Sequence, residues 1–386
     1  MRILSLSNCP LDEHMGSGYV TLGYARRLRE RGHEVDLLGP AEFEPLRRLG
    51  RGTGYRQALG MATASLRRLA ANDYDVVEFW GGEAWLALAL LAWLPRRPFL
   101  LVAHSNGLET HCAELLRAAE ADGRMARSRR WFQLDQSPLA ERGFRAADAL
   151  VTVGGFDRDY ALERGYAEPQ RALAVDNPLP EEYLGIEVDF ARPRVIGYCG
   201  SWIPRKGVAL LEASLPSVLR ALPEWRLVLV GVGDGFRPDE HFPADLLARV
   251  EVVPYAERGT QLRALYQGLS ILLLPSVYES FGLAAAEGMA CGAALVASPV
   301  GFAAGLRDRH EALLLNESSP QALQEAIESL ARDEELRQRI ARGGHRRVQS
   351  LRWDDAVVTV EAAYLRWLAE LRGARQRPAE GLSGCH

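Results

Sequence analysis

The sequence predicts an α/β protein made of two doubly wound domains that face each other across a cleft. Three observations lead to this fold class. Short, nearly continuous apolar runs recur along the chain, as is typical of parallel strands covered on both faces. Amphipathic stretches of helical periodicity separate most of these runs, which predicts right-handed βαβ units. The alternation restarts once, after a segment rich in proline and acidic residues at 177–193.

Each half of the chain supplies the strands of one sheet. We expect strands at 2–8, 33–39, 75–80, 99–105, 149–154 and 172–177, and then at 194–200, 226–233, 250–255, 271–275 and 294–298. The helical stretches after residue 319 are expected to close the C-terminal part. The domain boundaries are placed at 1–185 and 186–370, followed by a loose tail at 371–386. In such sheets a ligand binds outside the carboxyl ends of the strands.

Composition and charge exclude several functional classes. The 386 residues are 48% hydrophobic and 25% charged with a net charge of −4, so the basic excess of a nonspecific nucleic-acid binder is absent. Five scattered cysteines fit a reducing compartment better than a disulfide framework or a zinc site. The first residues are interpreted as a strand and the apolar run at 84–94 as a buried helix, because spanning a bilayer takes about 20 residues. We therefore expect a cytoplasmic protein.

The stretch ESFGLAAAEGMACG places two glutamates eight positions apart. In a uniform helix they would lie about 12 Å apart along the axis, too far for two acids that act on one bond. The helix is expected to begin between Phe281 and Leu283, with Glu279 before it and Glu287 on its second turn. The amides of Phe281, Gly282 and Leu283 would then form an anion site between the acids. A nucleotide sugar would contact all three features, although a solvated helix fits the spacing equally well.

Glycine-rich turns follow the first two strands of the second half. In GSWIPRKGV, Gly200 and Ser201 lead to Arg205 and Lys206 near a helix start, where cations and free amides suit a diphosphate. In GVGDG, Gly233 lets the backbone approach a base or a sugar. Either stretch alone is also typical of an ordinary solvated turn.

The N-terminal half offers a second glycine-rich stretch and a histidine. Gly16, Ser17 and Gly18 precede a helix and let the backbone approach a phosphate or an acceptor, but the stretch departs from the dinucleotide pattern G-x-G-x-x-G. His104 ends a strand and is expected to face the cleft, although a lone histidine is more often a structural hydrogen-bonding group. The basic, aromatic segment 124–133 is typical either of a charged helix face or of contact with anionic lipid.

Taken together, these motifs resemble those of the retaining glycosyltransferases of family four, whose two Rossmann-like domains form the GT-B fold. YESFGLAAAEGMACG resembles the two-glutamate signature of that family, and RKGV resembles its Lys-Gly pair. The stretches GSGYVTLGYARRLRERGHEV, RAADALVTVG and VDNPLP are similar to parts of its N-terminal domain. The resemblance extends over nearly the whole chain.

The resemblance implies a role for each matching residue. Glu279 would stabilise the charge that develops on the transferred sugar, and Lys206 would stabilise the diphosphate leaving group. Glu287 would bind the ribose hydroxyls, while His104 and the Gly16 loop would face the sugar and the acceptor. The family needs no catalytic metal or other cofactor. The implied activity is a hexosyltransferase that uses a nucleoside diphosphate sugar and a hydroxyl-bearing glycan, lipid-linked or small-molecule acceptor.

One departure affects the diphosphate site. The family usually has an arginine where this chain has Ser201, and we expect Arg205 to supply the second cation beside Lys206. A nucleotide-sugar epimerase on the same architecture and a binding protein without turnover stay open as alternatives. The sequence does not indicate the sugar, the base, the acceptor or whether the protein makes a peripheral contact at the inner membrane face.

Overall fold

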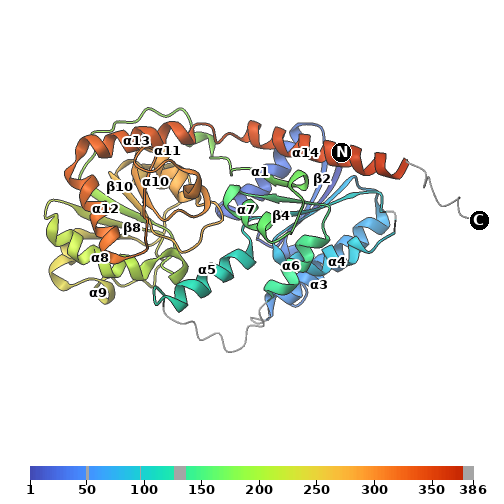
Figure 1. Cartoon of the computed structure of the whole chain (residues 1–386), viewed down its shortest axis with the longest axis horizontal. Coiled ribbons are helices and arrows are strands. Elements are labelled where there is room, and N and C mark those ends of the chain that lie inside the picture. Colours follow the sequence, from blue (N-terminus) through green and yellow to red (C-terminus); the bar gives the residue numbers. More distant parts are fainter. Residues whose placement is uncertain (49–51, 96, 126–135, 377–386) are drawn as a thin grey trace, which may run out of the picture.

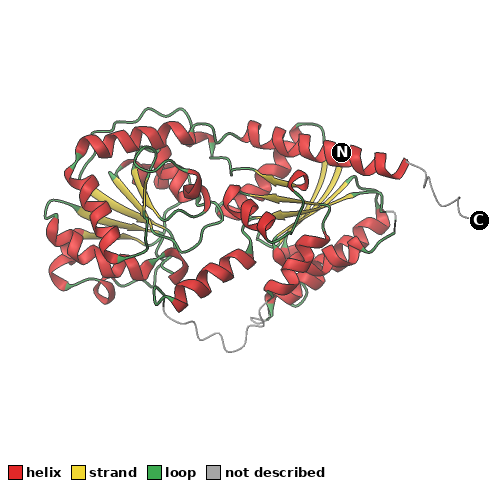
Figure 2. Ribbon diagram, viewed as in Figure 1, coloured by secondary structure: helices red, strands yellow, loops and turns green. Residues whose placement is uncertain are grey.

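The computed structural model describes residues 1–48, 52–95, 97–125 and 136–376. Two parallel six-stranded sheets, each flanked by helices, lie side by side along the long axis of the molecule (Figures 1 and 2). The predicted α/β class with two doubly wound sheets is therefore confirmed. Most of the basic segment expected at 124–133 lies outside the described residues.

The N-terminal sheet is built from the first six strands: β1 (Arg2–Ser7), β2 (Glu34–Leu38), β3 (Val76–Trp80), β4 (Leu100–Ser105), β5 (Ala149–Thr152) and β6 (Ala172–Ala174). Their order across the sheet is β2-β1-β3-β4-β5-β6, and all neighbouring pairs are parallel. The helices that follow them are α1 (Gly16–Glu30), α2 (Pro40–Phe43), α3 (Thr53–Ala71), η1 (Gly82–Ala84), α4 (Trp85–Ala92), α5 (Glu109–Ala121), α6 (Ser137–Ala146), α7 (Gly155–Glu163) and η2 (Pro169–Arg171).

The C-terminal sheet repeats this plan with β7 (Val195–Cys199), β8 (Arg226–Val230), β9 (Val250–Val253), β10 (Ile271–Leu274), β11 (Ala294–Ala297) and β12 (Leu313–Leu314). Their order is β12-β11-β10-β7-β8-β9, again fully parallel. The accompanying helices are η3 (Glu181–Tyr183), η4 (Pro204–Lys206), α8 (Val208–Ala221), α9 (Pro238–His241), η5 (Ala244–Arg249), α10 (Thr260–Gln267), α11 (Leu283–Ala290), η6 (Gly301–Gly305), α12 (Pro320–Arg332), α13 (Glu334–Val348) and α14 (Trp353–Gln376).

The strand order of each sheet creates one switch point. In the N-terminal sheet the chain winds from β1 to β2 on one side and then places β3 on the other side of β1. In the C-terminal sheet β8 and β9 lie on one side of β7 and β10 on the other. Ligands of doubly wound sheets bind at such points, outside the carboxyl ends of the strands. The loops after β1, β3, β7 and β10 are therefore the first places to search for a site.

Helix α14 packs on the N-terminal sheet, although its position in the sequence led us to expect it in the C-terminal domain. Its apolar face, which includes Val360, Tyr364 and Trp367, shares one core with Leu100 and Val102 of β4 (Figure 1). Apolar periodicity predicts that a helix buries one face, but it does not indicate which sheet covers that face. Residues 371–376 of the expected loose tail are the last turns of this helix.

Candidate active site

Lys206 and Glu279 come from the loops after β7 and β10, the two strands that flank the C-terminal switch point. The Nζ atom of Lys206 lies 2.6 Å from Oε1 of Glu279. The hydroxyl of buried Ser276 donates to the same oxygen at 2.7 Å. Lys206 is also the only lysine among the 46 basic residues of the sequence. Because every other basic residue is an arginine, a lysine at this position favours a role for which an arginine would not serve.

A tight backbone contact fixes Lys206 beside Glu279. Gly207, which follows η4, has a φ of +74°, and a Cβ atom there would lie 1.9 Å from the carbonyl oxygen of Pro275. The amide of Val277 donates to the carbonyl of Arg205 at 2.9 Å. Only glycine fits this position, so the turn that carries the lysine is tied to the loop that carries the glutamate.

Two helix N-termini approach each other across the cleft. Helix α11 begins at Leu283 after Gly282, and α1 begins at Gly16 after Met15; neither start has a side-chain cap. A Cβ atom on Gly16 would lie 3.4 Å from Cδ1 of Leu283. Uncapped helix starts present free amides and a partial positive charge, so their meeting suits a phosphate group.

Glu287 is buried on α11, which excludes the alternative of a solvated helix position. Its side chain is 4% exposed and accepts hydrogen bonds from Arg258 at 2.7 Å and from Tyr266 at 3.2 Å. Burial raises the pKa of Glu287, although the Arg258 guanidinium opposes this shift. Arg258 was not predicted from the sequence; its place in the loop after β9 is the signal that could have found it. It also lies 4.6 Å over the ring of Tyr19 on α1, so it contacts both domains.

Arg205 lies next to Lys206 at the Glu279 carboxylate. Its Nη1 atom is 4.0 Å from Oε2 of Glu279 and 3.3 Å from the carbonyl oxygen of Tyr278. Ser201 is exposed earlier in the same turn. Arg205 therefore lies beside the pair of Lys206 and Glu279, and its role as the second diphosphate cation stays a prediction.

Of the other predicted donor residues, Gly200 and Gly233 lie in the turns after β7 and β8, whereas the Phe281 side chain lies in the core. Gly200 donates its amide to the carbonyl of Val230 at 2.9 Å, and exposed Gly233 has a φ of +92° with open space beside its Cα. Phe281 is 2% exposed, and its ring lies 5.1 Å from that of Phe302. The Phe281 side chain therefore belongs to the core, which leaves only its backbone for a ligand.

Gly18, whose backbone was expected to approach a phosphate or an acceptor, is instead packed against the loop after β1. It is buried in the first turn of α1, where a Cβ atom would lie 2.2 Å from the carbonyl oxygen of Asp12. Its missing side chain lets the loop after β1 pack on the helix. Gly16 is exposed and Ser17 is half-buried, so they remain the candidates at this helix start.

The expectation that His104 faces the cleft is also wrong. Its side chain is 2% exposed and stacks on Trp80 with 3.4 Å between ring centroids. Its Nδ1 atom lies 3.8 Å from Oε2 of Glu78 and has no hydrogen-bond partner among the residues that the structure describes. Burial lowers the pKa of His104, so the imidazole is neutral near neutral pH. His104 does lie near the carboxyl end of its strand, as predicted. Its side chain, however, points toward Tyr24 of α1.

A polar cluster at the N-terminal switch point was missed by the sequence analysis. Asn8, which follows β1, donates its Nδ2 to Oε2 of Glu83 at 2.7 Å. The amide of Gly82, after β3, donates to Oε1 of Glu109 at 2.9 Å, while Oε2 of Glu109 is buried and has no hydrogen-bond partner in the described part of the chain. Burial and the neighbouring Glu83 carboxylate raise the pKa of Glu109 to about 8. None of these residues belongs to a motif, but they all lie close after strand ends.

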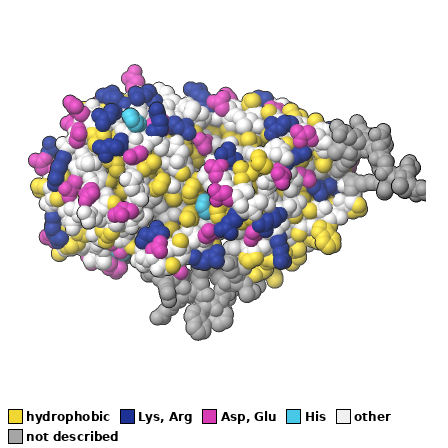
Figure 3. All heavy atoms as spheres, viewed as in Figure 1, with side chains coloured by type: hydrophobic (Ala, Val, Ile, Leu, Met, Phe, Trp, Pro, Cys, Tyr) yellow, Lys and Arg dark blue, Asp and Glu magenta, His cyan; other side chains and the backbone are white. Residues whose placement is uncertain are grey.

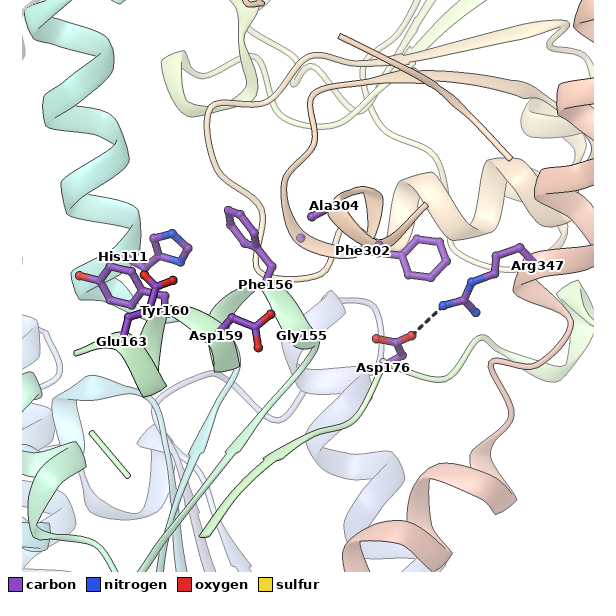
Figure 4. A pocket seen from close by; sticks show the side chains of 12 residues that line it. His111, Gly155, Phe156, Asp159, Tyr160, Glu163, Asp176, Phe302, Ala304 and Arg347 are labelled. Carbon is purple, nitrogen blue, oxygen red and sulfur yellow. Dashed lines mark hydrogen bonds and ion pairs between the residues drawn. The ribbon is translucent and has the colours of Figure 1, made fainter. Parts of the chain in front are cut away.

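Two cavities lie between the domains, one on each side of the loop that carries Glu279. The first, of about 410 Å³, is lined by residues of α7 and η6 and by the ion pair of Asp176 with Arg347 at 3.3 Å (Figure 4). The second, of about 300 Å³, is lined by the start of α5 and by Arg205, Tyr278 and Ser280. This second cavity also reaches Glu109, whose carboxyl group accepts from the amide of Gly82 after β3.

A buried hydrogen-bond network joins the domains behind this cavity. Tyr278 donates its hydroxyl to Oδ2 of Asp157 on α7 at 2.9 Å. Asp157 is fully buried, pairs with Nδ1 of His111 at 2.8 Å and accepts from the amide of Leu108 at 3.1 Å. The loop that carries Glu279 is thus held against the N-terminal domain.

Within residues 1–48, 52–95, 97–125 and 136–376, no group of three or more His, Cys, Asp or Glu side chains is arranged to hold a metal ion. In the same ranges, no helix has the length and apolar character needed to cross a membrane.

Comparison with known families matches both halves of the chain. A model described as Glycosyltransferase Family 4 matches residues 15–179, and one described as Glycosyl transferases group 1 matches residues 193–333. A D-inositol 3-phosphate glycosyltransferase of Geodermatophilus obscurus is 26% identical over 440 residues, which cover 98% of this chain and 92% of that protein. The corresponding protein of Segniliparus rotundus is 27% identical over 64% of this chain, but the match spans only 56% of its own length.

Solved structures share the fold. Sucrose-phosphate synthase from Thermosynechococcus elongatus has a TM-score of 0.76 at 19% identity, and the match covers 96% of this chain and all of that one. Anabaena Alr3699/HepE in complex with UDP has a TM-score of 0.65 at 18% identity, with 96% and 100% coverage. Two family matches that together span most of the chain, and a two-sheet architecture shared with these structures, lead to one conclusion: the chain belongs to glycosyltransferase family 4 and has the GT-B fold.

Proposed function

We propose that this glycosyltransferase transfers a hexose from a nucleoside diphosphate sugar to an acceptor hydroxyl, with retention at the anomeric carbon and without a catalytic metal. One observation carries the proposal. Glu279 and Glu287 are both buried on either side of the start of α11, and each is paired with a cation from another element. Such an arrangement suits two hydroxylated groups separated by phosphates.

The donor would lie along this row of groups. Its diphosphate would bind the uncapped starts of α11 and α1 together with Lys206 and Arg205, which supply positive charge without a metal. The ribose would hydrogen-bond to Glu287, and the sugar would lie at Glu279. The solved complexes of Anabaena Alr3699/HepE with UDP and with UDP-glucose, on the same fold, support a donor of this class.

The proposed chemistry takes place on one face of the sugar. The bond between the anomeric carbon and the diphosphate oxygen breaks, and the acceptor oxygen forms its bond on the same side. The acceptor proton passes to the departing phosphate oxygen. Lys206 and Arg205 stabilise the negative charge on the leaving group, while the Glu279 carboxylate stabilises positive charge on the sugar ring.

The acceptor would enter through the cavity of about 300 Å³ beside Arg205. Glu109 lines this cavity, and burial together with the neighbouring Glu83 carboxylate raises its pKa to about 8. With this raised pKa the Glu109 carboxyl is mostly protonated near neutral pH and can donate a hydrogen bond to a hydroxyl, so we propose a neutral polyhydroxylated acceptor. The relatives named D-inositol 3-phosphate glycosyltransferase supply the alternative: an acceptor panel that favours inositol 3-phosphate over neutral sugars would contradict this part of the proposal.

A thermal-shift panel of nucleoside diphosphates and their sugars tests the donor site. A ligand that binds only the folded state at a hundred times its Kd adds about 2.7 kcal/mol to the free energy of unfolding. We expect one base to raise the Tm most, and Glu287→Gln to reduce that shift. The exposed Glu325→Gln on α12 is the matched control and should leave the shift unchanged. If no nucleoside diphosphate stabilises the protein, the proposed function is wrong.

A further inference from the structure

Large hydrophobic side chains are exposed mainly on one part of the N-terminal domain. Twelve such side chains are exposed among the described residues, and seven of them lie between residues 46 and 94. The most exposed are Trp93 at 89% and Leu46 at 72%. We propose that this part, the α3–α4 surface formed by Leu46, Leu59, Leu66, Leu90, Trp93 and Leu94, docks onto an anionic lipid bilayer.

Helix α3 presents an apolar stripe at the edge of the face that packs in the core. Leu59 and Leu66 are seven positions apart and therefore lie on the same helix face, where they are 51% and 42% exposed. Ala62, three positions after Leu59 and four before Leu66, is buried in the core of the N-terminal sheet, so the two leucines extend the buried face outward. The apolar face of α3 is therefore wider than the part that the core covers.

The end of α4 extends this stripe. Helix α4 packs against α3, and Leu90, Trp93 and Leu94 at its end are at least 40% exposed. Figure 3 shows hydrophobic and basic side chains next to one another over the region where Figure 1 places α3 and α4. Tryptophan is enriched at membrane–water interfaces because its ring is apolar while its N–H stays near water.

Arginine predominates around this surface, although Arg56 and Arg97 pair with Glu44 and Asp148. Residues 45–72 contain six arginines and no Asp or Glu, and residues 84–108 contain two arginines and no acid. Arg47, Arg48, Arg67 and Arg68 are exposed. The whole chain has a net charge of −4, so this concentration of positive charge is local.

The combination favours a bilayer over other occupants. A second copy docked on the same surface would bring arginines against arginines. Nucleic acid would use the arginines but gain little from exposed leucines. An anionic bilayer accounts for both the basic and the apolar side chains, because its headgroups attract the arginines and its interface accepts the leucines and the tryptophan.

The surface adjoins the N-terminal switch point. At the start of α3, Gln57 donates its side-chain amide to the carbonyl oxygen of Asn8, which follows β1, at 3.1 Å. A bilayer on α3 and α4 would therefore lie near the crevice where the proposed function places the acceptor. Only this consequence depends on the proposed function; the docking itself requires neither a donor nor turnover.

Co-sedimentation of the full chain with vesicles tests the docking. We expect binding to vesicles of equal parts phosphatidylglycerol and phosphatidylcholine, weaker binding as salt is added, and none to phosphatidylcholine alone. The double variants Leu59→Ser with Trp93→Ser and Arg67→Glu with Arg68→Glu should each weaken binding about tenfold or more. The matched control, Val358→Ser with Leu365→Ser, removes two exposed side chains of α14 and should bind like the wild type.

The same variants separate the possible failures. Their Tm and their response to nucleoside diphosphates should equal those of the wild type, because the changed side chains are exposed and distant in sequence from the donor residues. Unchanged vesicle binding by both double variants, or no binding by the wild type, would overturn the docking proposal and leave the donor site untouched. A wild-type dimer without vesicles that dissociates in the Leu59→Ser and Trp93→Ser variant would assign the surface to a second copy instead.

Discussion

Lys206 and Glu279 neutralise each other in the ligand-free protein. Their contact at 2.6 Å keeps a lysine next to the proposed leaving group and a carboxylate next to the proposed sugar. The pair is only partly exposed, at 18% and 12% for the two side chains. A donor that inserts its phosphates here would share the lysine with Glu279 rather than meet a disordered side chain, which lowers the cost of organising the transition state.

Replacing the single lysine tests this role. We expect Lys206→Ala to lower turnover about 10²–10³-fold, because it removes one positively charged group from the developing diphosphate. The exposed Arg226→Ala on β8 should leave turnover unchanged. Because Lys206 is the only lysine, an amine-reactive label mapped by mass spectrometry should modify it and be blocked by the nucleoside diphosphate that stabilises the protein. If the nucleoside diphosphate does not reduce the labelling of Lys206, its phosphates do not bind at this lysine.

Glu109 predicts a pH dependence of stability. Burial and Glu83 raise its pKa in the folded protein to about 8, from an ordinary value of 4.5. The folded state therefore binds a proton that the unfolded state has lost between these values, so stability falls as the pH rises through this window. The slope is about 1.4 kcal/mol per pH unit at most.

The variant Glu109→Gln has no carboxyl group at this position and therefore cannot lose this proton. Unfolding by urea at several pH values should show that its advantage over the wild type grows between pH 4.5 and 8. Below pH 4.5 the two should depend on pH in the same way. Parallel profiles across the whole range would show that Glu109 titrates normally.

At the scale of elements, the turn from η4 to α8 depends on one glycine. Gly207→Ala would place a Cβ atom against the Pro275 carbonyl at a positive φ. We expect a loss of about 3 kcal/mol or more in the free energy of unfolding, because backbone must shift on both sides. Gly235→Ala, with open space around it, should change stability by about 0.5 kcal/mol or less. Equal urea midpoints for the two variants would contradict this explanation of the turn.

Most strands could be predicted from sequence because they are short apolar runs, and those in the middle of each sheet are buried on both faces; the edge strands β2, β6 and β9 are partly exposed. The same reasoning singled out Glu279, Glu287 and Lys206 as site candidates, because they lie close around one helix start and one turn. It missed β12, which has two residues and therefore no pattern. It also missed Arg258 and Glu109, because their partners lie 29 and 27 positions away along the chain and meet them only in the folded sheet.

The errors have a common physical origin. Sequence position near a strand end predicted which edge of the sheet holds His104, but strand alternation sends its ring into the core beside Trp80. Apolar periodicity predicted α14 but not the sheet that buries it. In both cases the local pattern was read correctly, and the partner was decided by tertiary packing.

At the scale of the whole molecule, the two domains contact each other through side chains next to the site. Tyr278 of the Glu279 loop bonds to Asp157 of α7, and Arg258 lies over Tyr19 of α1. Helix α14 crosses from the C-terminal part of the chain to the N-terminal sheet, so both domains share one chain end. Closing and opening of the cleft would therefore change the surroundings of Glu279 and Glu287 together.

Removing one interdomain hydrogen bond tests this coupling. Tyr278→Phe keeps the ring but leaves Asp157 with His111 and the Leu108 amide. We expect a more open molecule in solution scattering and a lower kcat with a smaller change in donor affinity, because closure excludes water from the reaction. Tyr160→Phe, which removes a hydroxyl bonded to Glu114 within the N-terminal domain, should change neither. If the two variants behave alike, the Tyr278 contact does not control closure.

The most direct test of the central claim is the anomeric configuration of the product. With the donor that stabilises the protein most, proton NMR can follow the first sugar transferred to an acceptor, or to water, before mutarotation. The arrangement of Glu279, Lys206 and Arg205 on one side of the cleft predicts a product with the same anomeric configuration as the donor. A product of inverted configuration would contradict the account.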